Sequence, residues 1–546
     1  MTSPTPSRSA RSRTRRRPLT LTALLLSAAL VTGCAGSDGG DGGDAAPKAD
    51  RGGSMFSIGF VGDQLEGEPT DGGRLSISTF GELRSMDPVD LIANGLSGGS
   101  ELAAIYDVLV RYDPETAEYE PHVAESLEPN DDSTVWTMTL REGVNFSDGT
   151  PLDAAAVVAS IERYLADEGG QASLWSSKVA TTEATDERTV TFTLAEPWVD
   201  FEYMLATAPG MIMAPAAYAG KEFTPIGAGP FTFGHYRPNE ELLLEANPDY
   251  WGGEPPLDEL RFHNVQTAEG TFDVVRAGSS DVGVIREPSV TKEAIDAGFG
   301  GAMNVVSMGF GLIVNNREDS ATGDVRVRQA IAHAVDPEGI YRRTYNGVGL
   351  PGTEMFPEES QWGGAAGPEI DLDRAKQLVE EAKADGWDGK VGYLGIQVVS
   401  QNTGLGLEAM LAQVGIELEA EYVAGSADMI QRVFAERSFD LAGWSFGTPD
   451  AAVFPELYEN FHSESRSNAA GYASETMDGL IEQLGAAESE DEQQDLIDQI
   501  QEEWNATIPS IVLGAQPEFV VWGDHVGGVV PHVDSMMLYH RAWTEK

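Results

Sequence analysis

A globular pattern of interspersed apolar and polar residues runs without a break from Gly72 to the C-terminal Lys546. A single hydrophobic core stops growing at roughly 250–300 residues, and longer chains divide into separately packed regions. Hydrophobic residues make up 41% of the 546, which is enough for large cores. We find no internal repeat with a period of roughly 20–50 residues. The length therefore predicts at least two lobes.

Short stretches of the chain carry the periodicities of both strands and helices. Residues 188–194 alternate threonine with apolar residues, which predicts a strand buried on one face, and residues 229–251 predict a hairpin around Arg237-Pro238-Asn239. Apolar side chains at helical spacing predict helices over residues 157–165 and 477–484. The expected fold class is therefore α/β, in a mixed α+β arrangement.

Two further helices are predicted from their first residues. Ser489 and Glu492 form a capping box in front of an apolar stripe, and Asp336-Pro337 has the sequence of an N-cap followed by the first helical residue.

The N-terminus has the layout of a secretory signal. Residues 1–18 contain six arginines and no acidic residue, and the apolar segment Leu19–Val31 follows. A transmembrane helix needs about 20 apolar residues, so an uncleaved anchor is the weaker alternative. We expect a signal peptide over residues 1–33, exported by the general or, through Arg15-Arg16, the twin-arginine route.

Cys34 is the only cysteine in the chain. Val31-Thr32-Gly33-Cys34 resembles a bacterial lipobox, in which the thiol receives a diacylglyceryl group and becomes the new N-terminus. The alternative is an ordinary cysteine near a cleavage site, but a free thiol is a liability in an oxidising compartment. We expect lipidation of Cys34, followed by a flexible Gly- and Asp-rich tether over residues 34–70.

The charge balance excludes one class of partner. With 35 basic and 88 acidic residues, the formal net charge is −53, which repels nucleic-acid phosphates. The chain has no H-E-x-x-H, Cys-x-x-Cys or P-loop motif, and its eight histidines are dispersed. We expect no cofactor and no metal site.

Two glycine-rich motifs suggest enzymes. Gly95-Leu96-Ser97-Gly98-Gly99 matches the G-x-S-x-G nucleophile elbow, but an elbow needs a strand directly before it, and Pro88 and Asn94-Gly95 indicate turns instead. Residues 404–409 match G-x-G-x-x-A, but residues 400–403 separate these glycines from the preceding strand. We interpret the first motif as a helix-capping loop and the second as part of a structural βαβ unit.

Several sequence blocks together resemble one known family. Residues 106–164 (YDVLVRYDPETAEYEPHVAESLEPNDDSTVWTMTLREGVNFSDGTPLDAAAVVASIERY), PIGAGPFTF, NPDYWGGEPPLDELRF, DVRVRQAIAHAVDPEGI and FDLAGWSFGTPD are similar, in this order, to extracellular solute-binding proteins of the oligopeptide/dipeptide/nickel class of ABC importers. This resemblance implies a two-lobed clamshell. Lobe I would span residues 71–308, lobe II residues 309–507, and residues 508–546 would return to lobe I.

The resemblance also implies where a solute would bind. The two crossings between lobes would fall at Ser307–Asn316 and Ala506–Ala515, with the ligand between the lobes. The Gly-Trp segment of the family lines the cleft, which suggests Trp444, Ser445 and Phe446. Peptide binders place an aspartate just after this Trp, but here the stretch is GWSFGTPD and the nearest aspartate is Asp450. The weaker candidates are Phe310, Ser97 and Trp175.

The expected function is capture of a small solute, most simply a peptide, by a lipid-anchored monomer at the outer face of the cytoplasmic membrane. Its partners would be an ABC permease and the ATPase of that permease. Two alternatives within the family are an oligosaccharide or a metal chelate as the solute. The alternative from another class is a secreted serine hydrolase that uses Ser97.

Overall fold

The computed structural model describes residues 54–91 and 94–545. The expected signal peptide, Cys34 and the first part of the expected tether lie outside these residues. The described residues belong to one compact unit. None of the helices in this part of the chain combines the length and the apolar character that crossing a membrane requires.

The folded body begins before residue 70, where the tether was expected to end. Phe56 is only 4% exposed and packs in a hydrophobic cluster with Phe272 and Phe519. Strand β1 (Gly59–Val61) pairs antiparallel with β13. The apolar residues of this segment therefore dock it on the folded body.

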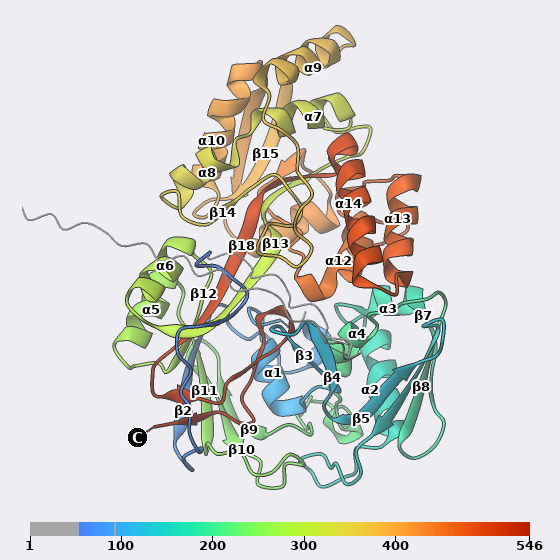
Figure 1. The fold of residues 1–546 in the computed structure, drawn as a ribbon, viewed down its shortest axis with the longest axis vertical. Helices are drawn as coiled ribbons and strands as arrows, with labels where there is room; N and C mark the ends of the chain where they lie inside the picture. The colour runs from blue at the N-terminus through green and yellow to red at the C-terminus, as the bar shows by residue number, and fades with distance from the viewer. Residues whose placement is uncertain (1–53, 92–93, 546) are drawn as a thin grey trace, which may run out of the picture. The chain divides into compact units, whose positions relative to one another are not determined.

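Twelve of the described strands form the main sheet, ten of them in the order β16-β15-β17-β13-β18-β12-β2-β11-β10-β9 (Figure 1). Its strands are β1, β2 (Arg74–Thr79), β9 (Phe231–Arg237), β10 (Glu241–Ala246), β11 (Glu259–Asn264), β12 (Val282–Ile285), β13 (Gly300–Val314), β14 (Leu350–Pro351), β15 (Lys390–Ile396), β16 (Glu417–Val423), β17 (Leu441–Ala442) and β18 (Ser510–Trp522).

Two long neighbouring strands connect the two ends of this sheet. β13 and β18 pair antiparallel from Gly300–Trp522 to Ile313–Ser510, and every residue of β18 is buried. The two crossings expected from the sequence, residues 307–316 and 506–515, include the adjoining parts of these two strands. Because these strands lie side by side, the chain connects two regions of the protein twice. We call residues 74–296 the first region and residues 325–442 the second region.

The first region carries a second sheet, with strand order β5-β6-β8-β7. The predicted strand is β8 (Thr189–Leu194), the predicted hairpin is β9 and β10, and the predicted helix over 157–165 is α2 (Ala154–Ala166). The other elements of this region are α1 (Gly99–Tyr106), β3 (Val110–Asp113), β4 (Glu118–Pro121), β5 (Ala124–Pro129), β6 (Val135–Leu140), α3 (Ala172–Lys178), β7 (Val179–Ala184), α4 (Glu202–Ala206), α5 (Ala268–Arg276) and α6 (Pro288–Asp296).

The second region consists of β15–β17 with the helices α7 (Val325–Ala334), α8 (Pro337–Thr344), α9 (Leu372–Ala384), α10 (Gln401–Leu411) and α11 (Ser426–Ile430). Strands β15 and β16 are parallel and α10 connects them, which confirms the predicted βαβ unit. The motif at residues 404–409 lies inside α10. A Cβ on Gly404 would lie 2.3 Å from the Tyr422 hydroxyl oxygen, so this glycine permits close packing.

Three C-terminal helices, α12 (Val453–Phe461), α13 (Glu475–Ala486) and α14 (Glu490–Thr507), confirm two of the predictions. α13 covers residues 477–484, and α14 begins after Ser489, whose Oγ accepts a hydrogen bond from Glu492 N at 3.2 Å. These helices share the hydrophobic core of the first region, where the rings of Trp198 and Phe454 lie 5.2 Å apart. The expected boundaries at residues 308 and 507 stay a prediction.

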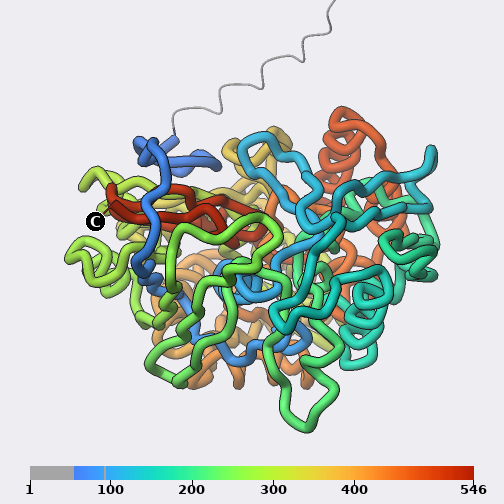
Figure 2. The backbone as a smooth tube through the Cα atoms, turned by 90° about the horizontal axis from the view of Figure 1, so that it is seen from below, coloured from blue at the N-terminus to red at the C-terminus, as the bar shows by residue number. Residues whose placement is uncertain are grey.

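The C-terminal part of the chain lies close to the first described residues. β18 and β2 both pair with β12, and the blue segment crosses the red one in Figure 2. The short elements β19 (Val526–Gly527), β20 (Val530–Pro531), β21 (Met537–Leu538) and β22 (Trp543–Thr544) complete the chain.

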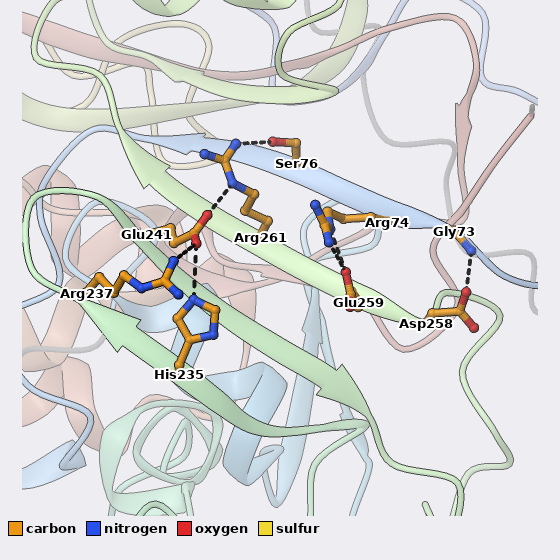
Figure 3. A network of polar contacts seen from close by, with 9 residues as sticks. All are labelled: Gly73, Arg74, Ser76, His235, Arg237, Glu241, Asp258, Glu259 and Arg261. Atoms are coloured by element: carbon orange, nitrogen blue, oxygen red, sulfur yellow. Dashed lines mark hydrogen bonds and ion pairs between the residues drawn. The ribbon is translucent and has the colours of Figure 1, made fainter.

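A network of charged residues covers one face of β9, β10, β11 and β2 (Figure 3). The carboxylate of Glu241 accepts from Arg261 and Arg237 at 2.7 Å each and lies 3.1 Å from His235 Nε2. These hydrogen bonds, led by that of Arg261, lower the pKa of Glu241 to about 2. The network ties together β2, β11, β10 and β9, the four strands at one end of the sheet.

Candidate functional site

A cavity of about 770 Å³ lies beside an irregularity in β13. Its walls come from residues 306–311, 443–449 and 456–460 and from the C-terminal part of the chain. Both regions contribute to it, the first through Asn94, Tyr203 and Arg286, and the second through Tyr393, Ser400 and Thr403. Cavities that hold small molecules typically measure about 300–1,000 Å³.

The irregularity in β13 positions one wall of the cavity. The register of β13 against β18 shifts after Val306. The segment that follows β17 is attached to this bulge, because Thr448 N donates to the Ser307 carbonyl oxygen and Ser445 Oγ donates to the Gly309 carbonyl oxygen, both at 2.8 Å. These bonds fix residues 443–449 as a wall.

Four of the predicted site residues line this cavity together: Phe310, Trp444, Ser445 and Phe446. The ring of Trp444 meets Phe434 edge-on at 6.4 Å, and Phe310 lies 5.5 Å from the ring of Tyr341. The structure therefore brings these four side chains to one place. Their contact with a solute stays a prediction.

Asp450 does not line this cavity. Its carboxylate accepts from Ser360 Oγ at 2.6 Å and from Gln361 N at 2.8 Å, and its carbonyl oxygen accepts from Trp362 Nε1 at 3.1 Å. It borders a much smaller cavity, of about 30 Å³, which shares Pro449, Glu518 and Asp534 with the larger one. Through these hydrogen bonds, Asp450 holds the loop at residues 360–362 in place.

Neither Ser97 nor Trp175 lines the cavity. Ser97 Oγ donates to Asn94 Oδ1 at 2.9 Å, and Asn94 and Leu96 are the lining residues of that loop. The preceding described element is the 3₁₀ helix η1 (Pro88–Asp90), not the strand of a nucleophile elbow. Trp175 is 1% exposed and packs 5.6 Å from the ring of Phe201.

The sequence analysis missed a group of carboxyl groups in the cavity wall. Glu456 and Glu459 lie one turn apart on α12, and Asp534 lies in the 3₁₀ helix η7 (Val533–Ser535). Glu456 Oε2 accepts from Asn460 at 3.0 Å, and Asp534 Oδ2 accepts from Tyr203 at 3.0 Å. Among the described residues, Glu459 Oε1 and Asp534 Oδ1 are buried oxygens without a hydrogen-bond partner.

Burial dominates the ionisation of these three groups. It raises the pKa of Glu459 and of Asp534 to about 7. It raises the pKa of Glu456 well above the usual range, and the charges of Glu459 and Asp534 add to this effect. No cation is among the causes of these shifts. Glu456 and Glu459 form an acidic pair among the mostly apolar residues of α12, which could have been noticed in the sequence. No neighbouring residue distinguishes Asp534 in this way.

The basic residues of the cavity are Arg286, Arg437 and Arg466. Arg286 is paired with the buried Glu518, which is 3% exposed, at 3.0 Å, and Glu518 also accepts from Ser535 Oγ at 2.6 Å. Within residues 54–91 and 94–545, Arg437 and Arg466 form no ion pair. In the same ranges, no cluster of three or more metal-ligating side chains is found.

Comparison with known proteins places the chain in a family. The model of "Bacterial extracellular solute-binding proteins, family 5 Middle" matches residues 118–467. A putative ABC transporter peptide-binding protein of Brucella ovis is 27% identical over 376 residues, which are 62% of this chain and 69% of that protein. The dipeptide-binding protein of Escherichia coli K12 is 24% identical over 494 residues, 82% of this chain and 90% of that protein.

A solved structure has the same fold. The periplasmic binding protein DppA of Helicobacter pylori, in complex with the peptide STSA, superposes with a TM-score of 0.72 at 23% identity, over 87% of this chain and 99% of that one. The fold is thus the two-lobed one of periplasmic binding proteins. The serine-hydrolase alternative is wrong, because the relatives are extracytoplasmic binding proteins of ABC importers and not enzymes. The chain belongs to family 5 of the bacterial extracellular solute-binding proteins.

Proposed function

We propose that this protein captures a short peptide with a free amino terminus in the cavity beside β13 and delivers it to an ABC permease with its ATPase. The observation that carries the proposal is the group formed by Glu456, Glu459 and Asp534, in which buried oxygens lack partners. A peptide ammonium placed there would supply the missing donors and the opposite charge.

The physical argument is the cost of burying charge. An ionised carboxylate that loses water without gaining a partner costs several kcal/mol, and the raised pKa values of Glu459 and Asp534 express this cost. An ammonium within hydrogen-bond reach would bring these pKa values down again. The group would thus pair with the peptide ammonium in place of Asp450, the nearest aspartate after Trp444.

The same group argues against the two alternative solutes. An oligosaccharide has no cationic group to pair with these carboxyl groups, and an anionic metal chelate would be repelled wherever they are ionised. The relatives from Brucella and Escherichia coli, a putative peptide-binding protein and a dipeptide-binding protein, support a peptide.

We further propose that the protein works as a monomer at the outer face of the cytoplasmic membrane, anchored through lipid on Cys34. The single cysteine behind a short apolar segment supports this anchor. Two acyl chains give stable anchoring where one chain gives only marginal binding. Closure of the two lobes by bending of β13 and β18 would present the filled cavity to the permease.

Native mass spectrometry tests the solute. Protein freed of bound solute by unfolding and refolding is mixed with a pool of random tripeptides or with the same pool after N-acetylation. We expect retention of the free-amine pool and at least tenfold weaker retention of the acetylated pool. Glu459→Gln should reduce this preference, and Glu502→Gln, an exposed site on α14, should not. Retention of neither pool would contradict peptide binding.

A further inference from the structure

One carboxyl group of the cavity beside β13, which we call the solute cavity, comes from a short hairpin near the C-terminus. β20 and β21 pair antiparallel, and η7 forms the turn between them. We call residues 530–538 the C-terminal hairpin. Asp534, at its turn, lines both the solute cavity and the small cavity of about 30 Å³. Because Asp534 borders two spaces, its backbone must be fixed for its carboxyl group to face the solute.

The backbone of this turn is held in an unfavourable conformation. Asp534 and Ser535 have φ values of 55° and 61°, in the left-handed region that a residue with a side chain rarely adopts. Such residues persist only where the surrounding contacts fix them. If those contacts were lost, the turn would relax, and the carboxyl group of Asp534 would move with it.

His532 makes two of these contacts from inside the C-terminal hairpin. It is 3% exposed, and its Nε2 lies 2.8 Å from the Ala206 carbonyl oxygen at the end of α4. Its Nδ1 lies 3.0 Å from Tyr112 N in β3. Because a carbonyl oxygen can only accept, Nε2 donates and Nδ1 accepts, which fixes the tautomer of the ring. Burial lowers the pKa of His532 to about 4, so the ring is neutral at pH 7.

The helix that accepts from His532 also holds Asp534. Tyr203, in the same helix α4, donates a hydrogen bond to Asp534 Oδ2 at 3.0 Å. The ring of His532 therefore fixes the position of the C-terminal hairpin against α4 at which Tyr203 reaches Asp534. The turn has one more support, because Gly95 N donates to the Asp534 carbonyl oxygen at 2.8 Å.

We propose that His532 is a positioning residue of the solute site, whose neutral ring holds the C-terminal hairpin so that Asp534 presents its carboxyl group to the amino end of the solute. This inference rests on the proposed function. His532 does not line the solute cavity and acts on the solute only through Asp534. Its two hydrogen bonds join the C-terminal hairpin to β3 and α4 of the first region.

A double-mutant cycle between His532 and Asp534 tests this role, with native mass spectrometry of the free-amine and N-acetylated tripeptide pools. Wild type should prefer the free-amine pool at least tenfold. His532→Ala should reduce this preference to within about threefold and leave retention of the acetylated pool unchanged. Asp534→Asn should reduce the preference at least as far. The double variant should lose no more than Asp534→Asn alone, because His532 acts through Asp534.

Conservative variants separate positioning from a loss of packing. His532→Gln keeps an N–H donor for the Ala206 carbonyl oxygen, and His532→Asn keeps an acceptor for Tyr112 N. Each retains one of the two hydrogen bonds and should show a preference between those of wild type and Asp534→Asn. Thermal unfolding shows which variants fold, and if His532→Ala does not, these two variants carry the test.

The matched control is His333→Ala on α7. The Nδ1 of His333 also lies close to a main-chain carbonyl oxygen, that of Glu369 at 2.7 Å, but His333 lines neither the solute cavity nor the small cavity. This variant should keep the full preference for the free-amine pool.

Two results would overturn the inference while leaving peptide binding intact. One is an unchanged free-amine preference in folded His532→Ala, or in both conservative variants. The other is a double variant that loses more preference than Asp534→Asn alone, which would mean that His532 acts by a separate route. Failure of the proposed function gives a different result, because wild type would then retain neither pool or show no preference.

Discussion

Ser445 Oγ lies 2.8 Å from the carbonyl oxygen of Gly309 and donates a hydrogen bond to it. This bond joins the segment after β17 to the irregular part of β13, two places that are 136 positions apart in the chain. It holds Trp444 and Phe446 against the solute cavity. The apolar wall of the cavity therefore depends on a contact between distant segments.

Removal of this bond should loosen the cavity wall. Ser445→Ala leaves the Gly309 carbonyl without this donor, and we expect a loss of about 1 kcal/mol in the free energy of unfolding together with weaker tripeptide binding. Chemical denaturation and calorimetric titration measure the two effects. Ser176→Ala, at an exposed serine of α3 whose hydroxyl makes no hydrogen bond with the described residues, is the control. Unchanged stability and binding would show that the wall is held by other contacts.

Asp450→Asn should act on stability rather than on specificity. The amide keeps one oxygen acceptor, so the bonds from Ser360 and Gln361 cannot both remain. We expect a loss of about 1 kcal/mol or more in the free energy of unfolding, and equal weakening of free-amine and N-acetylated tripeptides. A selective loss of free-amine binding would return Asp450 to the binding site. Asp428→Asn, at an exposed position on α11, serves as the comparison.

Glu459 should make stability depend on pH. Its pKa is about 7 in the folded protein, above the usual value of 4.5, so the folded state holds the proton over a range in which the unfolded chain has lost it. The stability of the solute-free protein should therefore fall as pH rises from about 4.5 to 7, by on the order of 1–2 kcal/mol for this half-buried group.

Glu459→Gln should remove this contribution. Unfolding with guanidinium gives the difference in the free energy of unfolding between variant and wild type at pH 5 and at pH 8. The change in this difference between the two pH values measures the contribution of Glu459. The ionised form of Glu459 is buried only at the higher pH, and its burial lowers the stability of wild type there. The stability of the variant relative to wild type should therefore be higher at pH 8 than at pH 5. A difference that is the same at both pH values, or that matches Glu502→Gln, would contradict the assignment.

Glu241 should have the opposite pH dependence. Its pKa is lowered to about 2, mainly by the hydrogen bond from Arg261, so the carboxylate stabilises the folded state above pH 4.5 and loses this effect as pH falls toward 2. Glu241→Gln should lower Tm at pH 7, and the difference from wild type should shrink on acidification. Thermal unfolding between pH 3 and 7 measures this, with the exposed Glu254→Gln as control. A Tm difference independent of pH would mean that packing, not charge, explains the loss.

Cys34→Ala tests the anchor. We expect the variant to leave the membrane fraction or to remain unprocessed, because the thiol that accepts the diacylglyceryl group is gone. Membrane fractionation and the mass of the mature protein measure this. If the variant stays in the membrane fraction with a normal mature mass, Cys34 is not the attachment site.

Local elements of the fold could be predicted because their signals lie within a few residues. The alternation at β8, the stripe of α2 and the cap at Ser489 each depend on neighbours in sequence, and the structure confirms all three. The cap at Asp336 shows the limit of such signals. α8 begins at Pro337 as expected, but the Asp336 carboxylate pairs with Arg342 at 3.0 Å instead of capping the helix.

By itself, the sequence determined the mixed fold class, the family and the cavity positions of Phe310, Trp444, Ser445 and Phe446. Only the tertiary structure decided which charged groups face the cavity. Asp450 is the aspartate nearest to Trp444 in sequence, but the distant loop at residues 360–362 occupies its carboxylate. Glu456 and Glu459 on α12 and Asp534 in η7 line one cavity only because the fold brings these two distant parts of the chain to the same wall. Electrostatic interactions depend on distance in space, which spacing along a chain does not encode.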